Sequence, residues 1–120
     1  MVIESAFDSL DHVIRGKAGV LGPFTEIPAR WAIQRKGIDI NAMRPVDDVC
    51  RISPRPVLLI YGDQDRTIPS GAQRAMFAAA CGSEETWLVA GAGHQDFTEV
   101  VPDAYSFRLL DFFARGLSAN

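Results

Sequence analysis

The chain has 120 residues, 48% of them hydrophobic and 22% charged, which is enough for one domain with a buried core. A formal net charge of −3, with lysine only at positions 17 and 36, offers no basic surface for nucleic acid or an anionic membrane. No stretch approaches the ~20 apolar residues of a membrane span and no signal-peptide pattern opens the chain, so a cytoplasmic location is expected.

The two cysteines, Cys50 and Cys81, lie far apart and form no CxxC motif, which argues against a zinc site or a redox motif. Both are expected to be small buried hydrophobic residues in a reducing compartment.

The chain opens with three apolar residues, 1–3, that have the character of the end of a strand. A helix follows, with an apolar stripe at i, i+3, i+4 spacing: Leu10, Val13 and Ile14. Asp8 or Ser9 is expected to cap this helix and Gly16 to end it. His12 lies off the stripe and is interpreted as a surface histidine.

Residues 16–44 form the least regular part, in which glycine and proline recur. A short helix is predicted over 28–36, ended by Gly37. Three apolar side chains of this region, those of Phe24, Ile27 and Trp31, are expected either to form a lid over a site or to pack on the sheet. Packing on the sheet is favoured. Residues 45–50 predict a further short helix with proline first, so that Asp47–Asp48 mark its N-terminus rather than a metal pair.

The most informative stretch is 56–69, Pro-Val-Leu-Leu-Ile-Tyr-Gly-Asp-Gln-Asp-Arg-Thr-Ile-Pro. Its first half is an unbroken apolar run, which is typical of a strand buried on both faces in a parallel sheet. Its second half is a polar turn that carries Asp63 and Asp65. In open parallel sheets, ligands and chemistry gather beyond the carboxyl ends of strands, where these two carboxylates are predicted to lie.

Two further helices and a strand are predicted after this turn. Ser70 caps a helix that runs to about residue 80, and residues 86–89 form a second buried-type strand. A glycine-flanked loop with His94 follows. Pro102 opens the last helix, whose expected end is Gly116 and whose expected core side is Tyr105, Leu109, Phe112 and Phe113.

Strands separated by helices predict an α/β fold, in three α/β/α layers around a short parallel sheet, with residues 1–120 as a single domain. If the two clear strands are neighbours, Asp65 and His94 lie close together although 29 residues separate them. A carboxylate that accepts a hydrogen bond from one imidazole nitrogen fixes the tautomer of the ring, and the other nitrogen can then act as a general base. Alternatively, Asp65 is a turn residue that caps the next helix and His94 is a solvated loop residue.

The segments 56–69 and 89–94 (Val-Ala-Gly-Ala-Gly-His) together resemble the C-terminal half of an α/β-hydrolase. The similarity is greatest to the esterase, lipase and serine-peptidase branch related to dienelactone hydrolase. The resemblance implies that Asp65 is the acid and His94 the histidine of a catalytic triad, and that Asp63 is a turn residue. It also implies that residues 16–44 are the variable lid region.

One feature of that family is missing, because no Gly-x-Ser-x-Gly nucleophile motif occurs and Ser5 and Ser9 lack flanking glycines. The isolated chain is therefore expected to be inactive, with a serine outside it as nucleophile. The strand at 1–3 would have an uncovered edge, which predicts a homo-oligomer or a partner chain.

Two functions remain open. The first is hydrolysis of a small-molecule ester or amide, and the second is a non-catalytic module that self-associates or binds a partner or a small apolar ligand. No cofactor is expected. A metal site built on Asp63, Asp65 and His94 is less favoured, because the spacing matches no known signature. A phosphoacceptor receiver domain is disfavoured, because no lysine follows Lys36.

Overall fold

The structure is a computed structural model that describes residues 1–18, 22–82 and 84–118. The elements follow one another as β1 (Val2–Glu4), α1 (Leu10–Ala18), α2 (Pro23–Arg35), α3 (Pro45–Asp48), the 3₁₀ helix η2 (Val49–Ile52), β2 (Val57–Gly62), α4 (Ser70–Ala79), β3 (Glu84–Val89), α5 (Phe97–Val100) and α6 (Pro102–Ser118). Among the described residues, no helix has the length and hydrophobicity needed to cross a membrane.

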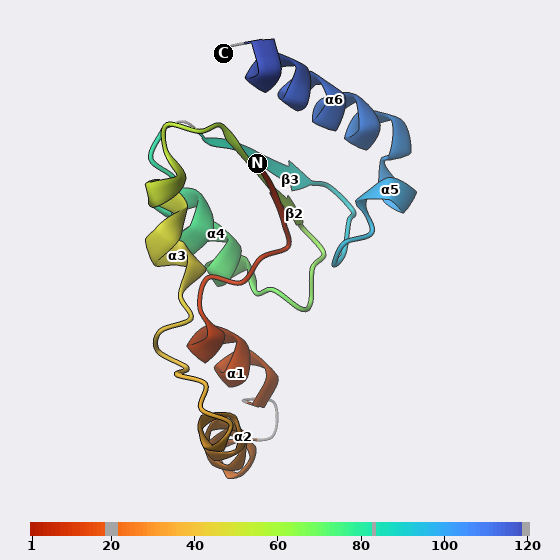
Figure 1. Ribbon diagram of the computed structural model, residues 1–120. Helices are drawn as coiled ribbons and strands as arrows, with labels where there is room; N and C mark the ends of the chain where they lie inside the picture. The colour runs from red at the N-terminus through yellow and green to blue at the C-terminus, as the bar shows by residue number, and fades with distance from the viewer. Residues whose placement is uncertain (19–21, 83, 119–120) are drawn as a thin grey trace.

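The three strands form one parallel sheet in the order β1-β2-β3 (Figure 1). Glu4 pairs with Ile60 near the end of β1, and Gly62 pairs with Val89 at the ends of the other two strands. The predicted parallel sheet is therefore confirmed. All three carboxyl ends lie at one edge, which brings the turns that follow them together.

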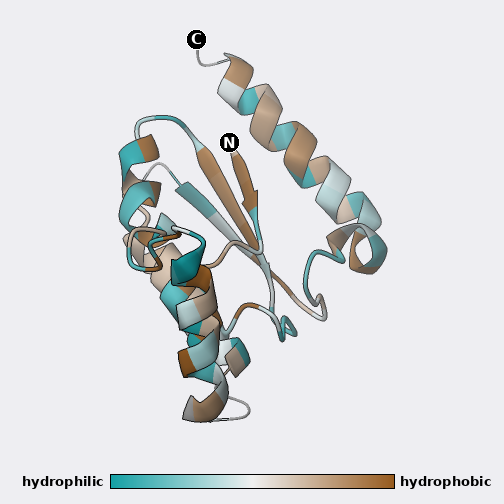
Figure 2. Ribbon diagram, turned by 60° about the horizontal axis from the view of Figure 1, so that its bottom comes forward, coloured by the Kyte–Doolittle hydropathy of each residue, from teal (hydrophilic) through white to brown (hydrophobic). Residues whose placement is uncertain are grey.

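The central strand β2 is buried on both faces, as its apolar run predicts. Val57, Leu59 and Tyr61 belong to the core shared with α3, η2 and α4. Leu58 and Ile60 belong to the opposite core, shared with α5 and α6. Figure 2 shows the apolar strands between the helices of the two sides. The three-layer α/β/α arrangement is thus confirmed.

The N-terminal helices differ from the prediction in their limits. The hydroxyl of Ser9 accepts a hydrogen bond from the backbone N–H of His12 at 3.2 Å, so the predicted cap is confirmed. Gly16 does not end α1, which continues to Ala18. The expected start of the second helix at residue 28 is wrong, because α2 begins a turn earlier at Pro23 and keeps Pro28 in its interior. Gly37, with φ of 77°, follows the end of α2 as expected.

The C-terminal helices also differ in detail. Ser70 is not the N-cap of α4 but its first residue. The N-cap position is Pro69, and no side chain makes a capping hydrogen bond at this end of the helix. Gly116 does not end α6, which runs on to Ser118. Phe113 is half-exposed rather than part of the core, whereas the other three predicted core residues of α6 do pack on the sheet: Tyr105, Leu109 and Phe112.

The prediction that both cysteines are small buried hydrophobic residues is wrong. Cys50 of η2 and Cys81, just beyond α4, form a disulfide with a Cα–Cα distance of 5.1 Å, and Cys81 is exposed. The two residues are 31 positions apart, and only the packing of η2 beside α4 brings them together.

Helices α1 and α2 form an arm that projects from the sheet (Figure 1). Arg30 of α2 pairs with Asp11 of α1 and, at 2.9 Å, with Glu26. The expectation that the apolar residues of α2 pack on the sheet is wrong, because they lie at the surface with exposed fractions of 88, 68 and 58%: Phe24, Ile27 and Trp31. Residues 19–21 of the predicted lid region lie outside the described residues.

Candidate functional site

Asp65 and His94, the two predicted site residues, meet at the carboxyl edge of the sheet. Asp65 lies in the turn after β2 and His94 in the loop after β3, and the distance from His94 Nδ1 to Asp65 Oδ2 is 3.0 Å. The Asp65 side chain is fully buried, whereas that of His94 is 34% exposed. The carboxylate is therefore shielded while the imidazole stays open to a reactant.

The turn after β2 holds the Asp65 carboxylate in a fixed orientation. Its Oδ1 atom accepts hydrogen bonds from the backbone N–H groups of Thr67 at 2.7 Å and Ile68 at 2.8 Å. Asp65 is thus a turn residue as well as the partner of His94, but it does not cap α4, where no side chain makes a capping hydrogen bond. One oxygen organises the turn and the other remains for the imidazole.

The loop that carries His94 is tied closely to the end of β2. Asp63 Oδ1 accepts from the backbone N–H of Gly91 at 2.7 Å, and the N–H of Gln64 donates to the carbonyl of Ala92 at 2.9 Å. A Cβ atom on Gly62 would lie only 2.2 Å from the Ala92 carbonyl oxygen. The close approach of this loop therefore requires glycine at position 62.

Two residues that sequence reasoning missed support the same loops. The side-chain amide of buried Gln73 donates to the carbonyls of Gly62 at 3.2 Å and Ile68 at 3.1 Å. Asp96 Oδ1 accepts from the backbone N–H of Gly93 at 2.7 Å. In the sequence, this supporting role of Gln73 is indicated only by its position, as a polar residue on the side of α4 that packs against the sheet.

A second carboxylate–histidine pair follows β1 at the same edge. His12 Nδ1 lies 2.9 Å from Asp8 Oδ2, so the partly exposed histidine that the sequence suggested is also paired. The Tyr61 hydroxyl donates to the Ala6 carbonyl at 2.8 Å. Burial raises the pKa of Tyr61, and the charges of Asp8 and Asp65 raise it further. Tyr61 thus lies within electrostatic reach of both carboxylates.

Ser5 is the residue that directly follows β1 at this edge. Its φ of 47° is unusual for a residue other than glycine. The side chain is buried, and its hydroxyl has no hydrogen-bond partner among the described residues. Among the described residues, His94 has Asp65 as its side-chain hydrogen-bond partner and no serine hydroxyl bonds to it. The geometry there is that of a carboxylate–imidazole pair without a bound nucleophile.

The carboxylates show other roles than metal binding. Asp63 binds the Gly91 amide, and the described residues contain no group of three His, Cys, Asp or Glu side chains placed to hold a metal ion. Asp47 forms an ion pair with Arg44 at 2.6 Å, which holds the pKa of Asp47 below its usual value.

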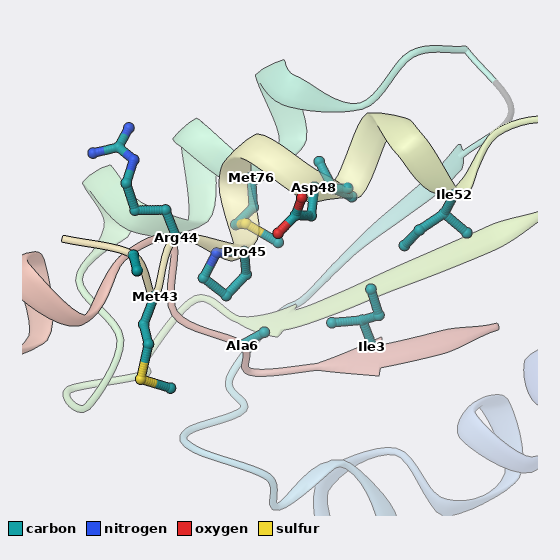
Figure 3. A pocket seen from close by; sticks show the side chains of 10 residues that line it. Ile3, Ala6, Met43, Arg44, Pro45, Asp48, Ile52 and Met76 are labelled. Atoms are coloured by element: carbon teal, nitrogen blue, oxygen red, sulfur yellow. The ribbon is translucent and has the colours of Figure 1, made fainter. Parts of the chain in front are cut away.

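An apolar hollow of about 340 Å³ opens on the opposite side of β1 from the α6 layer (Figure 3). It is bounded by β1, α3, η2 and α4, and its apolar lining includes Ile3, Ala6, Met43, Val49, Ile52 and Met76. Neither Asp65 nor His94 lines it. The hollow is therefore a feature separate from the Asp65–His94 pair.

Comparison with solved structures supports the fold. The alpha/beta hydrolase GrgF from Penicillium sp. sh18 matches 77% of this chain with a TM-score of 0.59 and 22% sequence identity. The chain spans 36% of the length of that hydrolase. A hypothetical protein from Pseudomonas aeruginosa, PA2218, matches 56% of this chain with a TM-score of 0.46 and 31% identity, and the chain spans 20% of it. No protein-family model and no curated protein matches. The similarity to GrgF shows that the chain has an α/β-hydrolase-like fold.

Proposed function

We propose that this chain supplies the acid and the base of a serine hydrolase of the α/β-hydrolase type, acting on a small-molecule ester or amide. The observation that carries the proposal is the contact between Asp65 and His94 at the carboxyl edge of a parallel sheet. Asp65 accepts the Nδ1 proton of His94 and so fixes the tautomer in which Nε2 is unprotonated. Nε2 then removes the proton of the nucleophile, and the Asp65 charge stabilises the resulting imidazolium.

The nucleophile in this proposal is a serine outside these 120 residues, in a hydrolase related to the dienelactone hydrolase branch, of which this chain is the C-terminal half. The absence of a Gly-x-Ser-x-Gly motif and the partial span of the solved hydrolase support it. Loss of the nucleophile removes the main catalytic step and leaves at most background catalysis, so the isolated chain should hydrolyse nothing measurable.

The missing part is proposed to join along β1, either from a partner chain or in a homo-oligomer. Within the described residues β1 pairs with a strand on one side only, and an open strand edge invites pairing. Because the Ser5 N–H and the Met1 carbonyl bond to β2, the Val2 N–H lies on the free side of β1.

Val2→Pro should therefore weaken association along this edge without breaking the hydrogen bonds between β1 and β2. Association that is unchanged in sedimentation would rule the edge out.

A fluorophosphonate probe that labels active serines tests the catalytic proposal. The chain is mixed or co-expressed with the N-terminal part of a related hydrolase that contains a Gly-x-Ser-x-Gly motif. Labelling of that serine is expected only in the presence of this chain. His94→Gln should reduce labelling by about 10³-fold or more, because the nucleophile loses its base.

His12→Gln is the matched control, because His12 also pairs with a carboxylate at this edge but follows β1. The proposal fails if His94→Gln labels like the unsubstituted chain, or if the complemented pair is never labelled. Labelling of the chain by itself, at Ser5 or another serine, would contradict the external nucleophile.

The second candidate function is a non-catalytic module that binds a small apolar ligand. The hollow of about 340 Å³ favours it, because ligand sites are typically concave, mostly apolar and of this size. Saturable binding of an apolar fluorescent dye that a charge on the exposed lining residue Met43 (Met43→Arg) abolishes, together with no labelling under any condition, would support this function over hydrolysis.

Three further predictions concern partners and location: the chain binds no nucleic acid, it binds no membrane, and it is cytoplasmic. The Cys50–Cys81 disulfide weighs against the cytoplasmic location, because disulfides persist mainly in oxidising compartments. Thiol labelling of the protein in its native cells distinguishes the two, since a cytoplasmic protein should present both thiols in reduced form.

A further inference from the structure

The apolar hollow beside β1 lies on the face of the sheet that carries α3, η2 and α4. Ile3 packs toward this face, whereas its neighbour Val2 packs with the core on the α6 side. Figure 3 shows Ile3 and Ala6 on one side of the hollow and Pro45 and Ile52 on the other. The hollow is thus the part of this face, over β1, that the described helices leave open.

Both connections between the strands cross the sheet on this same face. The connection from β1 to β2 passes through α3 and η2, and the connection from β2 to β3 passes through α4. All three helices pack in one core with Val57, Leu59 and Tyr61 of β2. Because the strands are parallel and lie in the order β1-β2-β3, the two connections advance in one direction and have the same hand.

This topology determines where a connection that enters β1 from outside would lie. Crossovers between parallel strands are right-handed in about 98% of cases. A parallel strand on the open edge of β1, followed in sequence by β1, continues the order of the sheet in the same direction. Its crossover therefore has to pass over the same face as α3 and α4, where Ile3 and the hollow lie.

The lining of the hollow suits a helix better than a small molecule. Its two charged residues are already ion-paired, Arg44 with Asp47 at 2.6 Å and Asp48 with Arg51 at 2.9 Å. Sites for small molecules usually add a few convergent polar groups to an apolar wall, and these groups fix the orientation of the ligand. An apolar wall whose charged groups are paired with one another matches the apolar side chains of an amphipathic helix.

We infer that the hollow is the docking site of an amphipathic crossover helix, which connects a strand paired along the open edge of β1 to β1 itself. The inference rests on the proposed function, because the strand and the helix belong to the missing N-terminal part of the hydrolase. The solved hydrolase GrgF supports it, since this chain spans 36% of that protein and leaves room for further strands and helices.

The helix supplies the larger part of the attraction between the two parts. β1 has three residues, so pairing along its edge provides few hydrogen bonds, each of modest net value. The helix buries apolar side chains against Ile3, Met43 and Ile52, and burial of apolar surface is the dominant favourable contribution to most protein association. The two contacts are adjacent, because Ile3 belongs to the strand whose edge is paired.

Photo-cross-linking of this chain, co-expressed with the N-terminal part of a related hydrolase, tests the inference. A photoreactive benzoylphenylalanine replaces Met43, which lines the hollow and is 46% exposed. It is expected to cross-link to the last helix of the N-terminal part, and mass spectrometry locates the linked residue. Ile38, which is 41% exposed and does not line the hollow, is the matched control position. Phe107 of α6 is the control for the opposite layer, and neither control should reach that helix.

Sedimentation velocity of the same pair measures how much the hollow contributes to association. Met43→Glu should weaken the association of the two parts by about tenfold or more, because it places a charge against the apolar face of the helix. Ile38→Glu should leave the association unchanged. Far-UV circular dichroism of each variant by itself checks that the chain stays folded.

The outcomes separate this inference from the proposed function. A cross-link from position 43 to that helix, without fluorophosphonate labelling of the serine, supports the docked helix and contradicts the hydrolase. Labelling of the serine without this cross-link, or with a cross-link to the helix from position 107 instead, overturns the docked helix and supports the hydrolase. Association that Met43→Glu leaves unchanged also overturns the docked helix. Two parts that never associate overturn both.

Discussion

At the carboxyl end of β2, Gly62 lies under the backbone of the loop that carries His94. A side chain at position 62 would be closer to that loop than any van der Waals contact, since its Cβ atom would come within 2.2 Å of one carbonyl oxygen and 2.3 Å of the next. Both contacts are with backbone atoms, which have no rotamer through which to move away. The position of His94 therefore depends on the absence of a side chain at a residue on the neighbouring strand.

Gly62→Ala should consequently destabilise the protein by about 2–3 kcal/mol, the cost of overpacking against a rigid backbone. Urea denaturation measures the change. Gly116→Ala is the matched control: its Cβ would meet only the Pro56 side chain, at 3.6 Å, and alanine favours the helix by up to about 1 kcal/mol. Equal free energies of unfolding for the two variants would contradict the close approach.

The Asp65 carboxylate determines which nitrogen of His94 carries the proton in the neutral ring. Its Oδ2 atom accepts from Nδ1 at 3.0 Å, so the neutral imidazole should be the Nδ1–H tautomer. In Asp65→Asn the amide donates instead, and the Nε2–H tautomer should replace it. The ¹⁵N chemical shifts of the His94 ring report this exchange, and the ring of His12 should show no change.

At the scale of elements, the Cys50–Cys81 disulfide joins η2 to the residue that follows α4 by two positions. The bond closes a long loop that contains β2 and the whole turn of Asp65, since its ends are 31 residues apart. Chain-entropy arguments assign about 3–4 kcal/mol of stabilisation to a loop of this length.

Cys50→Ser with Cys81→Ser should therefore lower the free energy of unfolding by about 3 kcal/mol, measured by urea denaturation. Treatment of the unsubstituted chain with a reductant should cause the same loss, and the reductant should have no effect on the double variant. A double variant as stable as the oxidised chain would show that the bond contributes nothing to the stability of the fold.

A second link between elements joins α6 to β1. The Tyr105 hydroxyl donates to the Glu4 carboxylate, and this hydrogen bond, together with burial, raises the pKa of Tyr105 to about 12. The folded state thus holds the phenol proton more tightly than the unfolded chain does, where the pKa is near 10. The stabilisation is complete below pH 10 and is lost as the pH rises through 12.

The free energy of unfolding should therefore fall between pH 10 and pH 12, and Tyr105→Phe should make this fall shallower. Some of the slope should remain, because burial raises the pKa of Tyr61 as well. Chemical denaturation at a series of alkaline pH values measures the slope. An identical slope in Tyr105→Phe would mean that the link to Glu4 is not made in solution.

At the scale of the whole molecule, the projecting arm makes the protein longer than a compact domain of the same length. The Cα radius of gyration is 16.2 Å, whereas a compact domain of this size has about 13–14 Å. X-ray scattering from the protein, extrapolated to infinite dilution, is expected to give the larger value. A radius near about 14 Å would show that the arm folds back on the sheet, as the sequence first suggested for its apolar residues.

Much of the central structure follows from local sequence. The unbroken apolar run of β2 can be satisfied only between two helical layers, and the glycine-bounded polar turns after β2 and β3 fall at the same edge of a parallel sheet. The proximity of Asp65 and His94 was predictable for this reason. Their roles in catalysis stay a prediction, because the contact between them does not include a nucleophile.

Other features depend on contacts between residues that are distant in the chain. The disulfide, the amide of Gln73 beneath the site and the exposure of Trp31 all result from how elements pack, and no local pattern distinguishes them from the alternatives. Periodicity reports that a helix has an apolar face, but not whether another element of the same chain covers it. The sequence by itself determined the strands, their turns and the proximity of Asp65 to His94, because these follow from backbone hydrogen bonding and burial in a parallel sheet. Only the tertiary structure decided which apolar faces are covered and which cysteines meet, because both depend on long-range packing.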